Sequence, residues 1–214
     1  MCVHCGKGTE TRDHVPSKVF LDEPFPANLP VVYSCEQCNN KFSKDEDYLA
    51  SLVECAKIGS IDLKKIERDK IAGVLQHSPA LYKKLANLIC EVEEVNLFTV
   101  ETNRIKTMLL KLARGHAAFE LHELHLEQPL HVSYALLNTF TDKSRRSFEE
   151  SPKLTMLPEV GSRALQRIVE SPNLLTEWII VQDKRYRYLT IRGFHTIIRG
   201  VIGEYLAFEV IWES

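Results

Sequence analysis

The chain has 214 residues, of which 44% are hydrophobic and 26% are charged, and its formal net charge is −2. This is the balance of an ordinary globular protein, long enough for one domain plus a small module or for two modest domains. No apolar run approaches the roughly 18 to 20 residues that span a bilayer, and no charged lead precedes an apolar stretch at the N-terminus. We therefore expect a cytoplasmic protein without a membrane partner.

Charge is unevenly distributed along the chain. Residues 1–50 carry eight acidic and five basic side chains, so the front of the chain is acidic. If the protein binds a phosphate backbone, we expect later basic clusters to hold it and the front to supply the chemistry. The alternative is that each cluster is an ordinary solvated face. These clusters are Arg104, Lys106, Lys111 and Arg114; Lys143, Arg145 and Arg146; and Lys184, Arg185, Arg187, Arg192 and Arg199.

The first 43 residues differ from the rest, because prolines at 16, 24, 26 and 30 prevent a long helix. Short strands are predicted at 18–20 and 30–33. Ser43 and Glu46 have the spacing of a capping box, which predicts a helix from about 44 to 58 that ends at Gly59.

Beyond this region the apolar periodicity predicts an α+β body. We expect helices at 61–76, 79–93 and 103–124, a strand or extended connection at 95–100, an extended segment at 129–140, a loop at 141–160 and a short helix at 161–170. Segments rich in β-branched and aromatic residues at 178–181, 186–191, 195–202 and 205–212 predict an antiparallel meander of three or four strands. The predicted organisation is a front module, 1–58, and a body, 59–214.

Four of the six cysteines form two C-x2-C pairs, Cys2 with Cys5 and Cys35 with Cys38. Two such knuckles complete a tetrahedral four-sulfur site suited to structural zinc, with no open position for substrate. Chance cysteines or a redox pair are the alternatives. His4, inside the first knuckle, is an alternative zinc ligand, but four cysteines already complete the site, so we expect His4 to face solvent. Cys55 and Cys90 lie in apolar helical patterns and are predicted to be buried structural thiols.

Between the knuckles lie Asp13-His14-Val15-Pro16 and Asn28-Leu29-Pro30, and Asn39 directly follows Cys38. Together with the cysteine pairs, these motifs resemble the HNH endonuclease family over residues 2 to about 50. The family's core is a ββα-metal finger, and the subgroup that this chain resembles has a four-cysteine zinc site and Asn at the third signature position. The remaining three-quarters of the chain carries no resemblance that we identify.

The resemblance implies a role for each of these residues. His14 would be the general base that activates water, Asp13 and Asn39 would hold a catalytic magnesium or manganese ion, and Asn28 would brace the loop that orients His14. Cys2, Cys5, Cys35 and Cys38 would bind zinc. Neutral imidazole and hard oxygen ligands suit these roles. Asp13 and His14 are adjacent, so a bend or bulge is expected to turn both toward one site.

Several departures from the family pattern accompany these roles. Lys41 or Lys44 is the candidate phosphate contact, and Asn40 is the less favoured alternative to Asn39 as a ligand. The acidic, proline-rich loop at 22–26 is an unusual surface to present to DNA.

Two further groups of residues have chemical potential. His122, Glu123 and His125 near a helix end form H-E-x-H, which lacks the spacing of a zinc protease motif, so exposed helix-end histidines are favoured; His131 follows. Trp178, Tyr186, Tyr188 and Trp212 offer a base-stacking platform, with core packing as the commoner fate.

The sequence thus predicts a metal-dependent HNH endonuclease that hydrolyses DNA phosphodiester bonds, with RNA as another candidate substrate. The body would select substrate, form a homodimer or dock a partner protein. The alternative is a non-catalytic zinc module that binds nucleic acid or protein, in which Asp13 and His14 only cap turns.

Overall fold

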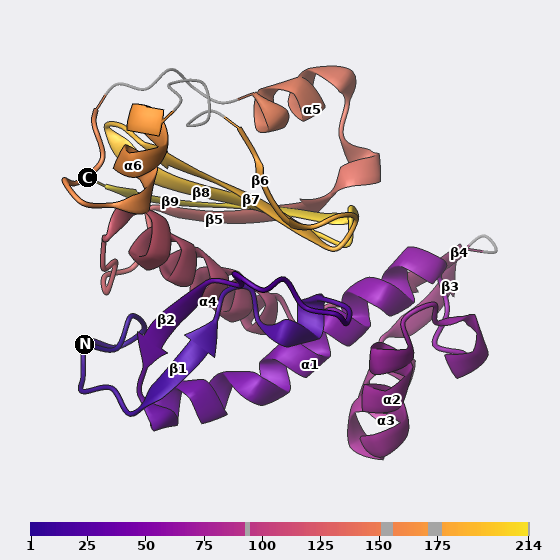
Figure 1. Cartoon of the computed structure of the whole chain (residues 1–214). Coiled ribbons are helices and arrows are strands. Elements are labelled where there is room, and N and C mark those ends of the chain that lie inside the picture. The colour runs from indigo at the N-terminus through magenta and orange to yellow at the C-terminus, as the bar shows by residue number, and fades with distance from the viewer. Residues whose placement is uncertain (93–94, 151–155, 171–176, 214) are drawn as a thin grey trace.

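A computed structural model describes residues 1–92, 95–150, 156–170 and 177–213, and it is an α+β structure (Figure 1). Its largest sheet has five antiparallel strands in the order β5-β9-β8-β7-β6. These strands are β5 (His131–Leu136), β6 (Ile179–Gln182), β7 (Tyr186–Arg192), β8 (His195–Ile202) and β9 (Leu206–Glu213). The predicted meander is confirmed as β6 to β9, and the segment expected to be extended at 129–140 adds β5 along β9.

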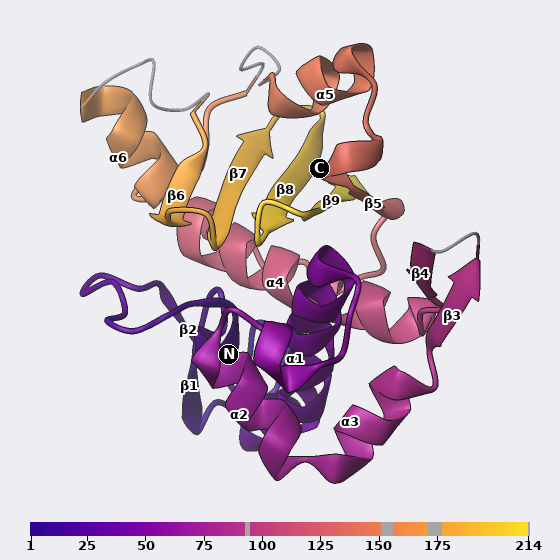
Figure 2. The same ribbon diagram turned by 90° about the vertical axis from the view of Figure 1, so that its right-hand side faces the viewer.

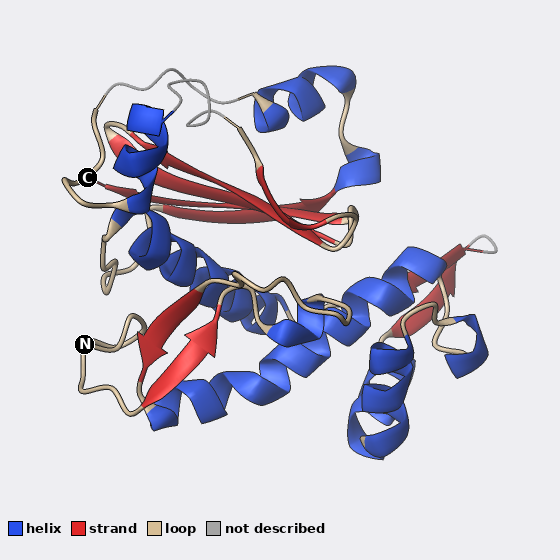
Figure 3. Cartoon of the chain, in the orientation of Figure 1, coloured by secondary structure: helices blue, strands red, loops and turns tan. Residues whose placement is uncertain are grey.

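The two faces of this sheet pack against different helices, as the alternation along β9 requires. Phe208, Val210 and Trp212 face the main core, which α4 (Thr102–Leu121) and α1 (Glu36–Ile58) complete. Ala207 points the other way, into a small cluster with Phe148 of α5 (Asp142–Glu149). Figure 3 shows α4 under the sheet and α5 beyond its opposite face.

The front of the chain is a two-stranded hairpin followed by a long helix. Strand β1 (Thr11–His14) pairs antiparallel with β2 (Val31–Ser34), and α1 begins two residues later. Helix α1 ends at Gly59 as predicted, in the left-handed conformation that glycine adopts at low cost (φ 61°). The predicted strand at 30–33 is β2, shifted by one residue.

A second layer extends from α1, away from the large sheet (Figure 2). It contains α2 (Asp69–His77), α3 (Pro79–Ala86) and a hairpin of β3 (Ile89–Val92) with β4 (Val95–Phe98). Helix α6 (Arg163–Glu170) contacts α4 and agrees with the short helix expected at 161–170.

Two predictions for the front of the chain are wrong. Residues Lys18–Phe20 form a single 3-10 turn, η1, because Val19 and Phe20 are both buried, and alternation along a strand would expose one of them. Ser43 does not start a helix: α1 begins at Glu36, with Cys35 as its N-cap, and the Sγ atom of Cys35 accepts a hydrogen bond from the backbone N–H of Cys38.

Three predictions for the middle of the chain also fail in part. Instead of one helix at 61–76 there is a 3-10 turn, η2 (Leu63–Lys65), and then α2, because Arg68 is extended and directs its side chain inward. The helix expected at 79–93 ends at Ala86, and the chain continues as the hairpin that begins with β3 at Ile89. Part of the loop expected at 141–160 is α5, which Thr141 caps by accepting from the N–H of Ser144; residues 151–155 lie outside the described chain.

The main hydrophobic core draws residues from both the front and the body. Phe20, Tyr48 and Leu49 lie in the same cluster as Met108 and Trp212. Among the described helices, no segment is long and apolar enough to cross a membrane.

Candidate functional site

The four cysteines of the two knuckles converge at one end of the hairpin. Their sulfur atoms all lie within 4.8 Å of one another, and those of Cys5 and Cys35 are 3.6 Å apart. Tetrahedral Zn–S bonds of about 2.3 Å place sulfur atoms about 3.8 Å apart, so this cluster has the right size for one zinc ion. The first knuckle is closed by the N–H of Gly6, which donates to the carbonyl of Cys2 at 2.9 Å.

The thiol electrostatics also suit a divalent ion. Burial raises the pKa of Cys2, but hydrogen bonds from the surrounding backbone outweigh it and bring the pKa to about 6. The pKa of Cys38 is raised, by burial and by hydrogen bonds and charge within the cluster. The first thiolate of the cluster therefore forms easily, and its negative charge disfavours a second one. A bound dication would remove this repulsion between thiolates. A four-cysteine cluster able to hold a metal such as zinc is thus present.

Asp13 of β1 is buried, with 6% of its surface exposed, and points between α1 and α4. Its carboxylate accepts from Nζ of Lys111 in α4, at 3.1 Å to Oδ1 and 2.9 Å to Oδ2, and lies 3.3 Å from Nε2 of His4. Burial raises the pKa of Asp13, but His4 and Lys111 outweigh it and hold the pKa below its usual value. The expectation that His4 faces solvent is wrong, because its ring is needed to partner this buried carboxylate.

The ammonium of Lys111 has two further partners. Its Nζ atom lies 2.8 Å from Oγ of Ser17 and forms an ion pair with Glu46, whose carboxylate also accepts from Ser17 at 2.6 Å. The charge network of Asp13, Ser17, Glu46 and Lys111 therefore connects three segments of the chain: the β1 region, α1 and α4 (Figure 1).

His14 follows Asp13 in β1 but lies on the other face of the strand. The β1–β2 register is regular through both residues, with no bulge to turn the two side chains together. His14 is half-buried, and its ring makes no hydrogen bond or ion pair with any other residue in the described part of the chain. Burial lowers its pKa, and the charges of Lys18 and Lys111 lower it further. His14 is therefore a neutral, accessible base at pH 7.

Neither of the two asparagines assigned from the resemblance makes a hydrogen bond to Asp13 within the described residues. Asn39 is in the first turn of α1, and its Nδ2 donates to Oγ1 of Thr11 at 3.4 Å. Asn28 is exposed on the loop before β2; the segment after His14 is held there by the N–H of Val15, which donates to the carbonyl of Pro30 at 2.9 Å. Lys41, Lys44 and Asn40 are exposed.

A magnesium or manganese ion does not fit at Asp13 in this arrangement. Such an ion needs free oxygen ligands in an octahedron. Both oxygens of Asp13 are bonded to Lys111, and the amide of Asn39 is turned to Thr11. A divalent ion would have to displace the ammonium before it reached the carboxylate.

Most arginines of the basic clusters are neutralised within the fold. Arg104 pairs with Asp45, Arg187 with Glu149 and Glu204, Arg192 with Glu123, and Arg199 with Glu209. Arg185 and the buried Arg68 both bind Asp22, so the acidic loop is also engaged internally. Charges committed to partners in this way contribute little to binding a phosphate backbone.

The histidines at 122, 125 and 131 differ in their exposure to solvent. His122 is exposed and takes the left-handed conformation that ends α4, as expected of a helix-end residue. His125 is buried instead, between the carboxylates of Glu123 and Glu127 and stacked on Trp212 with ring centroids 4.6 Å apart. His131 is exposed at the start of β5.

The aromatic residues considered for base stacking are mainly core residues. Tyr186, Tyr188 and Trp212 are buried, and Trp178 is half-buried beside Phe148. Among the remaining cysteines Cys55 is buried as predicted, and the side chain of Cys90 lies outside the described part.

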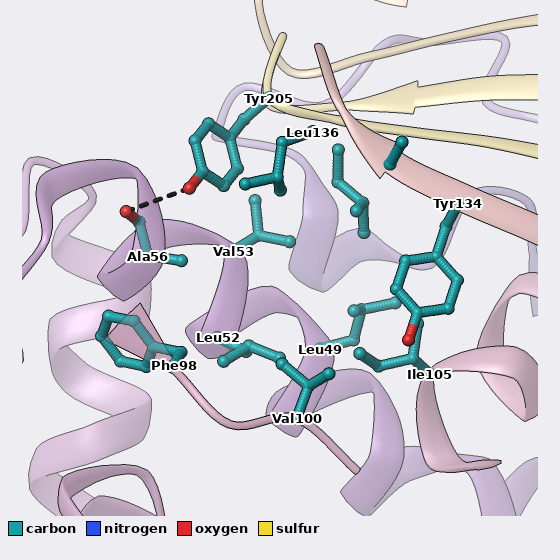
Figure 4. Close-up of a pocket in the computed structure, with 12 residues that line it drawn as sticks. Leu49, Leu52, Val53, Ala56, Phe98, Val100, Ile105, Tyr134, Leu136 and Tyr205 are labelled. Atoms are coloured by element: carbon teal, nitrogen blue, oxygen red, sulfur yellow. Dashed lines mark hydrogen bonds between the residues drawn. The ribbon is translucent and has the colours of Figure 1, made fainter. Parts of the chain in front are cut away.

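A cavity of about 400 Å³ lies between α1, the start of α4 and strand β5 (Figure 4). Leu49, Val53 and Leu136 form much of its wall, and the hydroxyl of Tyr205 donates to the carbonyl of Ala56 at its edge. The described residues that line it include no cysteine, histidine or carboxylate. The cavity therefore offers apolar contact area without groups for acid–base or metal chemistry.

The sequence predicted Asp13 as a site residue but did not reveal that Lys111, Ser17 and Glu46 form a network with it. A signal existed for Lys111: it lies on the same stripe of α4 as the buried Met108 and Leu112. A lysine on an apolar stripe indicates a buried ion pair, although its partner lies 98 residues away in sequence. Comparisons with protein-family models, with curated proteins and with solved structures give no significant match.

Proposed function

We propose that the chain is an HNH-type endonuclease whose finger, residues 1–58, is held by structural zinc and uses His14 as the general base. The observation that carries the proposal is the placement of His14. It lies at the end of β1, in the strand–strand–helix segment that contains the cysteine cluster, and its half-buried ring makes no hydrogen bond or ion pair with any of the described residues. A lowered pKa keeps that ring neutral at pH 7.

In this proposal His14 accepts a proton from water as the water attacks a phosphodiester phosphorus, and the P–O bond to the leaving oxygen breaks. Zinc remains structural, because four cysteines leave no coordination position for water. The substrate is DNA, with RNA as the second candidate. Because most arginines of the body are paired with carboxylates, we expect the protein to bind its substrate weakly. A monomer would then nick one strand, and cleavage of both strands would require a homodimer or a partner protein.

The test is nicking of a supercoiled plasmid by wild-type protein and by His14→Ala, each with magnesium, manganese or a chelator of divalent ions. His131→Ala is the matched control, since it removes an exposed imidazole far from β1 in sequence. Loss of nicking by about 10²-fold or more in His14→Ala alone supports the base, the usual contribution of such a group. Equal residual activity in wild type and His14→Ala contradicts it. Single- and double-stranded DNA and RNA, digested in parallel, identify the substrate.

A second candidate is a non-catalytic zinc module that binds nucleic acid or protein. It is favoured by one observation, the bonding of both Asp13 oxygens to Lys111. This candidate predicts zinc content and a stable fold without cleavage of any of the four nucleic acids.

A further inference from the structure

The ammonium of Lys111 lies where a cation bound by the finger would have to lie. Its Nζ atom is within 3.1 Å of both oxygens of Asp13 and 2.8 Å from the hydroxyl of Ser17, and it forms an ion pair with Glu46. Only 2% of the Lys111 side chain is exposed. These partners are all oxygen atoms, the ligand type that magnesium and manganese prefer.

We propose that Lys111 is the resident cation of this oxygen cluster, and that it excludes divalent metal from Asp13 while α4 is packed on the finger. The consequence for cleavage rests on the proposed nuclease, whereas the exclusion of metal is a property of the fold and is measured without activity. Any divalent-metal chemistry at Asp13 would then require Lys111 to withdraw.

The position of Lys111 is fixed by the packing of α4 against the finger. Gly115, one helical turn after Lys111, has the side chain of Val15 over its Cα: a Cβ atom built there would lie 2.6 Å from Cγ2 of Val15. Arg114, the residue before Gly115, donates a hydrogen bond to the carbonyl of His4 at 3.2 Å. The ring of Phe42, from α1, lies 5.7 Å from the ammonium.

Charge counting explains why the lysine belongs to the site. Asp13 and Glu46 are two carboxylates that bond the same nitrogen atom, and a buried carboxylate without a counter-charge is costly. Lys111 supplies one positive charge, a solvating donor for each carboxylate, and a donor to Ser17. Without the ammonium, the same two carboxylates and the hydroxyl become an open set of hard oxygen ligands. Lys111→Met should therefore convert the cluster into a divalent-cation site.

The experiment is a manganese titration of the full zinc-loaded chain, followed by electron paramagnetic resonance of the free ion. Wild type, Lys111→Met, the double variant Lys111→Met/Asp13→Asn and Lys106→Met are compared. Lys106 is an exposed lysine of the same helix, so Lys106→Met makes the same change in net charge away from the cluster. We expect Lys111→Met to bind one manganese ion at least about tenfold more tightly than wild type, about 1.4 kcal/mol.

The gain should be lost in the double variant and absent in Lys106→Met. Equal affinity of wild type and Lys111→Met, or a gain that survives Asp13→Asn, overturns the proposal. A second measurement uses the wild type alone and does not depend on the folding of a variant. Manganese added to the ¹⁵N-labelled chain should leave the amide signals of residues 12–15 no broader than those of other buried strands; selective broadening of these signals overturns the exclusion.

Failure of this proposal and failure of the nuclease are separate outcomes. His14→Ala changes neither manganese measurement if Lys111 excludes the ion, whether or not the chain cleaves nucleic acid. Conversely, the wild-type chain could cleave nucleic acid only with added manganese and bind manganese in a way that depends on Asp13. That result would support the proposed nuclease and overturn the role proposed for Lys111.

Discussion

Gly115 of α4 lies against Val15, the residue after His14, so closely that a methyl group at position 115 would lie 2.6 Å and 2.9 Å from the two Cγ atoms of Val15. Val15 is buried and belongs to the small cluster that includes Val3 and Val32. The N-terminal hairpin region and α4 therefore meet at a contact that has no room for a side chain on the helix.

Gly115→Ala should destabilise the protein. Alanine gains about 1 kcal/mol over glycine in a helix interior, but forcing a methyl group into a filled contact costs about 1–3 kcal/mol. We expect a net loss of about 1 kcal/mol in the free energy of unfolding, measured by urea denaturation. The matched control is Gly73→Ala in α2, where no atom lies within 4 Å of the added Cβ, and it should gain about 0.5–1 kcal/mol. Stabilisation by Gly115→Ala would contradict the close contact.

Arg68→Met should be strongly destabilising. Arg68 is buried, donates to the carbonyls of Val19 and Leu21, and lies 3.6 Å from the buried carboxylate of Glu54. Among the described residues, its loss leaves that carboxylate with one ion-pair partner, Arg185 at 4.0 Å, and removing one partner of a buried pair costs about 3–5 kcal/mol. The exposed pair of Lys84 with Glu101 is the comparison: Lys84→Met should change stability by no more than about 1 kcal/mol. Thermal or urea unfolding measures the stability of both variants, and equal losses of stability in Arg68→Met and Lys84→Met would contradict the prediction.

His125 should give the protein a pH-dependent term in stability. Burial lowers the pKa of His125, but hydrogen bonds to Glu123 and Glu127 and their charges outweigh it, so the pKa in the folded protein is raised above 6.5. The stabilisation is therefore fully present below the unfolded pKa of about 6.5 and is lost as the pH rises through the folded pKa. The free energy of unfolding of wild type minus that of His125→Gln should therefore fall as the pH rises above about 6.5. Urea denaturation of both proteins at several pH values measures this difference, and a difference that stays constant or grows with pH would contradict the prediction.

Zinc should be present at about one ion per chain by elemental analysis and should stabilise the N-terminal region. Cys35→Ala removes both a ligand and the N-cap of α1, so it should lose zinc and melt below the wild type. Cys55→Ala is the control because Cys55 is buried in the core, away from the cluster, and it should retain the metal. A folded wild-type chain that contains no zinc would contradict the four-cysteine site.

The sequence determined the features that depend on residues close together in the chain. The C-x2-C spacing predicted a cysteine cluster, Gly59 predicted the end of α1, and segments rich in β-branched and aromatic residues predicted the strands of the C-terminal meander. Each follows from a local preference: a knuckle turn, a left-handed glycine, and side chains that pack well on a pleated sheet. At Lys18–Phe20 packing prevailed over the local signal for a strand, and at Ser43 the N-cap supplied by Cys35 starts α1 earlier than the capping-box spacing predicts.

Tertiary structure alone decided the surroundings of Asp13 and His14. Nothing near Asp13 in sequence indicates that Lys111, 98 residues away, neutralises it, or that His4 turns inward to share the carboxylate. The physical reason is that a buried carboxylate must find a partner wherever the fold brings one, and only the packing of α4 on the hairpin through Gly115 and Val15 brings that ammonium within reach. The sequence thus identified ionisable and metal-binding residue types, and the fold determined which of them are paired with one another in the described part of the chain.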